Sequence, residues 1–144
     1  MSIGEKVRNG KEMIDIYIIN FTHPLTEEQL AQIEKIAGKK AAKIIQVASQ
    51  IDTDQLLVEQ VEAMVEEVGL TAEEWQSLPL LINLPSLNYS TAVMLALLHG
   101  RMGYFPATIR LRPATGAIPL CFEVAEIVNL QEVRERGRVQ RESR

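Results

Sequence analysis

Cysteine and histidine are scarce in this sequence. The 144-residue chain has one cysteine and two histidines. A disulfide framework needs paired cysteines, and structural zinc needs a cluster of thiols or imidazoles. We therefore expect no disulfide, no metal ion and no cofactor. The one thiol, Cys121, lies in a run of alternating apolar residues, so we expect a small, buried hydrophobic side chain.

Long apolar runs are also missing. No run approaches the roughly 20 residues that cross a bilayer, and the start, MSIGEKVRNGKEM, lacks the apolar core of a signal peptide. We expect a soluble, cytoplasmic protein without a membrane partner. Because 47% of the residues are hydrophobic and 24% charged, the chain can bury a sizeable core. Its length suits a single domain.

Basic residues are absent from a long central stretch. Residues 44–100 contain no lysine or arginine but hold eight acidic side chains: Asp52, Asp54, Glu59, Glu62, Glu66, Glu67, Glu73 and Glu74. With a net charge of −4, this distribution argues against binding to duplex nucleic acid. The charge reverses at Arg101, Arg110 and Arg112, which have no acidic residue among them. A small local anion site is therefore compatible with the sequence.

The common nucleotide and catalytic motifs are missing too. No segment has the spacing of a Walker loop, a GxGxxG turn or a metal cluster, which disfavours a dinucleotide enzyme. No carboxylate in the loops 20–24 and 83–91 could orient His23 or His99 as in a nucleophilic triad. The candidate catalytic residues are His23, His99 and Arg101.

Apolar runs alternate with helical patterns along the chain. We expect strands at 14–21, 43–49, 80–84, 107–112 and 119–128 and helices at 26–37, 57–68, 71–78, 90–102 and from 129 onward. This order predicts an α/β protein with a compact Rossmann-like, mostly parallel sheet, helices on both faces and right-handed crossovers. ATGA at 114–117 predicts a C-terminal hairpin between the last two strands.

Composition divides the chain into three parts. Residues 1–12 are expected to be a flexible leader, 13–135 one ligand-binding domain, and 136–144 a basic tail that frays into solvent. The helix at 90–102 is apolar on nearly every side. It is therefore either a dimer interface or a core helix enclosed by the rest of the chain.

Two loops are the best candidates for a binding site. In parallel sheets, ligands lie beyond the carboxyl ends of the strands, where neighbouring connections leave to opposite faces. This rule selects the polar loops 20–24 and 83–91, and the second precedes a helix whose free amides favour an anion. The alternative is that Thr26 and Ser90 are only helix caps and that the asparagines are only turn formers. The candidate ligand-binding residues are Asn20, Phe21, Thr22, His23, Asn83, Pro85, Ser86, Asn88, Ser90, Thr91 and Arg101.

Arginines supply further candidates. Arg101 could bind a phosphate beside the flanking glycines, although glycine at a helix end is usually a C-cap and His99 could simply complement the helix dipole. Arg110 and Arg112 share one face of their strand, where they could bind phosphate or solubilise a sheet edge.

Four segments resemble a known family: INFTHPLTEEQLAQIE (19–34), GLTAEEWQSLPLLINLPSLN (69–88), LHGRMGYFPATIRLRP (98–113) and FEVAEIVNLQEVRE (122–135). They are similar to small type III CRISPR accessory proteins of the Csx group, family fifteen, which are related to CRISPR-associated Rossmann fold (CARF) domains. The resemblance extends from Met13 to about Glu135. It implies a CARF-like fold, and Asn20 and Thr22 match the sensor pattern at the end of the first strand.

The resemblance also implies a function in antiviral defence. A homodimer would bind a cyclic oligoadenylate, with cyclic tetra-adenylate the expected ring, across its two-fold axis, and the acidic stretch would lie away from that pocket. Related sensors carry a fused effector nuclease, whereas only one domain is evident here. We favour sequestration of the messenger. The alternatives are a metal-independent ring nuclease and a non-catalytic scaffold that uses the apolar residues 92–98, and ligand-driven higher assembly stays open.

Overall fold

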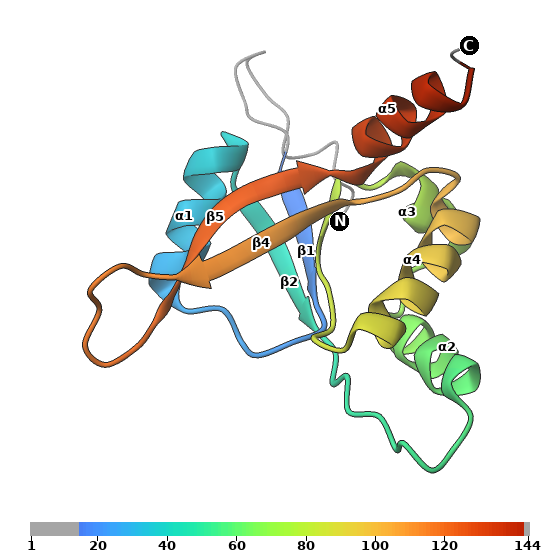
Figure 1. Ribbon diagram of the computed structural model, residues 1–144, viewed down its shortest axis with the longest axis horizontal. Coiled ribbons are helices and arrows are strands. Elements are labelled where there is room, and N and C mark those ends of the chain that lie inside the picture. The colour runs from blue at the N-terminus through green and yellow to red at the C-terminus, as the bar shows by residue number, and fades with distance from the viewer. Residues whose placement is uncertain (1–14, 143–144) are drawn as a thin grey trace.

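Five strands form one sheet in the order β2-β1-β3-β4-β5 (Figure 1). β1 (Ile16–Asn20) pairs in parallel with β2 (Ala41–Gln46) on one side and with β3 (Leu80–Asn83) on the other. β4 (Ala107–Pro113) is parallel to β3 and antiparallel to β5 (Phe122–Asn129). The sheet is therefore mostly parallel, as predicted.

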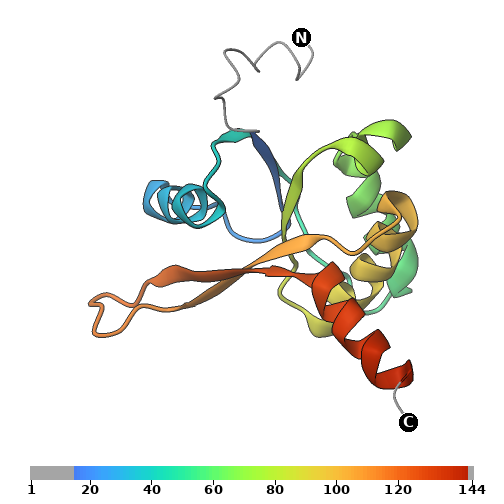
Figure 2. The same cartoon turned by 90° about the horizontal axis from the view of Figure 1, so that it is seen from above.

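Helices cover both faces of this sheet (Figure 2). α1 (Glu27–Ala37) lies on one face, and α2 (Leu57–Glu67), α3 (Ala72–Ser77) and α4 (Asn88–Met102) pack together on the other. α5 (Leu130–Glu142) follows β5 and projects from the body. This confirms the compact Rossmann-like α/β fold.

The computed structural model describes residues 15–142. The expected leader 1–12 and the last two residues of the expected tail lie outside this range. Among the described residues, none of the helices combines the length and apolar character that crossing a bilayer requires.

β1 is the central strand of the hydrophobic core. Because successive side chains of a strand point to opposite faces, Ile19 packs with Trp75 and Met94 under α2–α4, whereas Ile18 packs with Ile33 of α1. All five of these side chains are 5% exposed or less. Burial on both faces explains the nearly continuous apolar run in this segment.

Local sequence signals set the helix ends. Thr26 and Thr71 each form the predicted capping box, with the side chain three residues later bonding back to the cap amide. Gly38 ends α1 in the left-handed conformation, with φ 66°. α4 is not enclosed by the chain, because its small residues Ala92 and Ala96 are exposed opposite the buried side.

Two strands have other bounds than predicted, and the cysteine that was expected to be buried is exposed. β2 begins and ends earlier than residues 43–49, and β5 begins at Phe122 instead of 119. Since β4 ends at Pro113, the residues before Phe122 have no strand to pair with. Cys121 therefore lies in the connection 114–121, where its carbonyl accepts from the Ala114 amide (2.9 Å), and its side chain is exposed rather than buried.

The C-terminal residues differ as well. α5 continues to Glu142, so residues 136–142 are helical instead of frayed. Asn129 accepts from the Gln131 amide (3.1 Å), and Arg138 pairs with Glu142 one turn later (3.0 Å). Such i,i+4 pairs support an exposed helix locally, and none of its residues is buried in the core.

The two isoleucines of α1 provide a test of the core. Ile33 is completely buried, whereas Ile36, one turn away, is 47% exposed. We expect Ile33→Ala to lower the free energy of unfolding by about 2–5 kcal/mol, because it leaves a cavity against β1, and Ile36→Ala by less than about 1 kcal/mol. Urea unfolding of both variants measures the difference. Equal losses would show that α1 does not pack on the sheet in this orientation.

Candidate functional site

The two candidate loops meet at the switch point of the sheet. β1 and β3 are adjacent and in register, with Asn20 opposite Asn83. The chain after β1 leads to α1 on one face, and the chain after β3 leads to α4 on the other (Figures 1 and 2). The crevice between such diverging connections is the usual ligand position in this architecture.

Asn20 holds the first loop in place. Its side chain is completely buried, and its Oδ1 accepts from the Thr22 amide (3.0 Å) and from Asn83 Nδ2 (3.1 Å). Its Nδ2 donates to the His23 carbonyl (3.0 Å). Both acceptor positions of Oδ1 and one of the two Nδ2 donors are thus used inside the protein, and the side chain has no exposed surface that a ligand could contact. Asn20 is therefore a positioning residue that holds Thr22 and His23.

Gln46 supports the same loop from the neighbouring strand. Its Nε2 donates to the Thr22 carbonyl (2.6 Å). Gln46 was not among the predicted site residues, because the predicted strand ran from 43 to 49 and placed Gln46 in its middle. Its sequence position could have identified it: Gln46 carries the first amide side chain after the apolar residues Ile44 and Ile45, and β2 ends at this residue.

Short polar side chains line the outer surface of the site. Thr22 Oγ1 lies 3.5 Å from Ser86 Oγ, so hydroxyls from the two loops meet. His23 and Asn88, in the same two loops, are exposed, and Tyr89 is 45% exposed. Tyr89 was not among the candidate residues. Hydroxyls, an imidazole, an amide and an aromatic ring thus share this edge of the sheet.

The N-terminus of α4 supplies free backbone donors. Its N-cap is Leu87, which has no side-chain acceptor, so no side chain caps the helix. The first amides of an uncapped helix and its dipole favour an anion. Ser90 is therefore not a cap, contrary to the alternative interpretation. Its hydroxyl is buried without a hydrogen-bond partner, whereas Thr91 Oγ1 donates to the Pro85 carbonyl (2.8 Å) and fixes the loop.

Several candidate residues are not at this surface. Phe21 and Pro85 are buried. His99 and Arg101 lie at the other end of α4, and His99 is about 16 Å along the helix axis from Asn88.

The arginines are engaged in other contacts. Arg101 pairs with Glu66, and its guanidinium carbon lies 5.9 Å from the centre of the Trp75 ring. The His99 ring packs at a tilt of 44° against Phe105, with the ring centres 4.4 Å apart. The strand arginines also pair with carboxylates, Arg110 with Glu126 (2.5 Å) and Arg112 with Glu123 (2.7 Å).

The acidic residues of the stretch 44–100 do not all lie away from the candidate site. Residues 47–56, which include Asp52 and Asp54, leave β2 at the same edge of the sheet (Figure 1). The glutamates of α2 and α3 lie on the helical layer of one face. The polar loops 20–24 and 83–91 thus supply backbone amides, hydroxyls and amide side chains, while Asp52 and Asp54 lie on the connection that leaves the same edge.

The candidate site is built from backbone amides, hydroxyls, an amide side chain, an imidazole and an aromatic ring. Within residues 15–142, histidine, cysteine and carboxylate side chains form no cluster of three that could hold a metal ion. No protein-family model, curated protein or solved structure matches this chain. The fold and the site define a doubly wound α/β protein with hydrogen-bond donors gathered at its switch point.

Asn20→Ala tests the positioning role. The substitution leaves Thr22 N, Asn83 Nδ2 and the His23 carbonyl without a partner, so we expect the free energy of unfolding to fall by about 2–4 kcal/mol. The matched control is Asn88→Ala, at an exposed position, with less than about 0.5 kcal/mol expected. Chemical denaturation measures both. An Asn20→Ala variant as stable as the control would contradict this role.

Proposed function

We propose that this chain binds a cyclic oligoadenylate, with cyclic tetra-adenylate as the expected ring, and sequesters it. The observation that carries the proposal is the uncapped N-terminus of α4 beside the hydroxyls of Thr22 and Ser86. Backbone amides and hydroxyls bind phosphodiester oxygens without needing lysine or arginine. This suits a chain whose arginines near the sheet are paired with carboxylates.

The exposed side chains at this edge fit the bases of the ligand. Tyr89 offers a ring on which adenine could stack. Asn88 offers an amide that can bond to adenine N6 and N7. The match of Asn20 and Thr22 to the sensor pattern supports the same ligand, with Asn20 in the supporting role that its burial gives it.

A homodimer would complete the proposed site. One copy presents a single α4 N-terminus, whereas a cyclic tetranucleotide repeats its phosphates around a ring. Two copies related by a two-fold axis would present the same donors twice, in the symmetry of the ligand. Leu87 and Tyr89, 41% and 45% exposed, add apolar surface at the rim. The proposal places the protein in the cytoplasm, where it would lower the free messenger of a type III CRISPR response.

Sequestration is favoured over cleavage. Attack of a ribose 2′-hydroxyl on the adjacent phosphate needs in-line positioning and charge stabilisation. Of the three candidate catalytic residues, only His23 lies in the loops of the site, and no carboxylate of loops 20–24 and 83–91 can orient it. A ring nuclease would therefore depend on His23, and the test of function includes its substitution.

The first test follows both the binding and the fate of the nucleotide. We expect the full chain to shift labelled cyclic tetra-adenylate in a native gel and to leave it intact on chromatography. If the unaltered chain forms linear products and His23→Ala does not, the protein is a ring nuclease and not a sequestering protein. If neither binding nor cleavage occurs with any ring size, the proposal is wrong and the scaffold hypothesis leads.

A second test uses the helix end directly. Leu87 already has the extended backbone of an N-cap (φ −78°, ψ 132°), so Leu87→Asp should cap α4 and raise stability by about 0.5–2 kcal/mol. The same carboxylate would occupy the amides and repel phosphate, so affinity should fall at least tenfold.

Leu87→Asn is the matched control, because it caps about as well without adding charge. We expect it to bind more tightly than the aspartate variant and less tightly than the unaltered chain. Titration of cyclic tetra-adenylate against all three proteins, beside their thermal unfolding, measures both effects. Unchanged affinity in Leu87→Asp would place the ligand elsewhere.

A further inference from the structure

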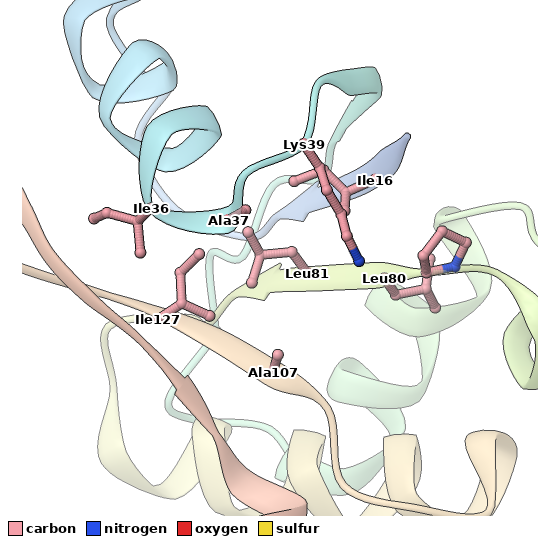
Figure 3. A pocket seen from close by; sticks show the side chains of 9 residues that line it. Ile16, Ile36, Ala37, Lys39, Leu80, Leu81, Ala107 and Ile127 are labelled. Carbon is pink, nitrogen blue, oxygen red and sulfur yellow. The ribbon is translucent and has the colours of Figure 1, made fainter. Parts of the chain in front are cut away.

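An apolar groove lies at the opposite edge of the sheet from the proposed nucleotide site (Figure 3). It has a volume of about 340 Å³ and is lined by Ile16, Ile36, Ala37, Lys39, Pro79, Leu80, Leu81, Ala107 and Ile127. Ile16, Leu80 and Ala107 are the first residues of the three parallel strands β1, β3 and β4. The groove therefore opens at the amino ends of these strands, whereas the polar site lies at their carboxyl ends.

The groove exists because residues 15–142 cover one face of the sheet only partly. Of the described helices, α1 alone lies on this face (Figure 2). The chain turns at Gly38 just after α1 and then enters β2, which leaves a groove beside the helix end, over the first residues of β3 and β4. The open strip is apolar, and Ile36 at its rim is 47% exposed. A volume near 340 Å³ is at the lower end of the range of small-molecule sites.

Among the described residues that line the groove, one cation reaches over this apolar surface. Lys39 is half-buried, and its side chain extends along the groove, with the ammonium directed toward Leu80 and Leu81 (Figure 3). Among the described residues, no carboxylate pairs with it, whereas the neighbouring Lys40 lies 4.0 Å from a Glu34 oxygen. An unpaired ammonium beside an apolar surface is complementary to a carboxylate that carries an apolar chain.

We propose that the groove binds a free medium-chain fatty acid. The hydrocarbon chain lies along Leu81, Ala107 and Ile127, and the carboxylate accepts hydrogen bonds from Lys39 Nζ. The apolar walls supply most of the binding, because burial of methylene groups is favourable in proportion to the area removed from water. The ammonium selects an anionic head group. This site is independent of the nucleotide proposal, since no residue is shared between them.

The test uses decanoate below its micelle-forming concentration and the full chain. We expect saturable shifts in the methyl NMR signals of Ile16, Leu81 and Ile127, with no shift at Val61, which is buried under the opposite face. Decyltrimethylammonium carries a similar chain with a positive head and should bind at least threefold more weakly. Absence of saturable shifts, or equal binding of the two amphiphiles, would overturn the proposal.

Two substitutions locate the ligand. Lys39→Met should weaken decanoate binding about three- to tenfold, while Lys40→Met, the matched control, should leave it unchanged. Ala107→Leu should fill the groove and weaken binding at least tenfold. If Ala107→Leu does not fold, the two lysine variants still test the proposal. Equal decanoate affinity in Lys39→Met and Lys40→Met would overturn the role of the ammonium.

Discussion

The contact between Asn20 and Asn83 is the constraint on which the polar site depends. Two amide side chains are buried where β1 and β3 end, 0% and 4% exposed, and a buried polar group without partners is costly. Asn20 meets this requirement by bonding to Asn83 and to the backbone of its own loop. The loop path is thereby set from inside the protein. As a consequence, the hydroxyls of Thr22 and Ser86 come within 3.5 Å of each other at the surface.

Local signals predicted most of the fold but not the connections between distant segments. The apolar run of β1, the capping boxes at Thr26 and Thr71, and Gly38 each act within a few residues, so the sequence reveals them. The exposure of Cys121 depends on where β4 ends on the partner strand, which the alternating pattern of its own segment does not contain.

The candidate site divides in the same way. The order of strands and helices was enough to predict that the loops after β1 and β3 lie side by side at the switch point of the sheet. By contrast, Arg101 lies at the end of α4 far from the site, and its guanidinium pairs there with Glu66, 35 residues away in sequence. Gln46 was overlooked because its role depends on the end of β2. Thus residues that act through local backbone geometry were predictable, and residues whose role is set by a distant partner were not.

An uncapped helix end does not by itself mark a binding site, and α2 shows why. Leu56 leaves α2 without a side-chain cap as well, but that end lies after a loop held by Gln60, which bonds to the Asp52 amide and carbonyl. α4 differs because its free end adjoins the hydroxyls of a second loop at the switch point and contains the unpartnered hydroxyl of Ser90. The combination of open backbone donors with a rigid, buried support is what makes this edge suited to an anion.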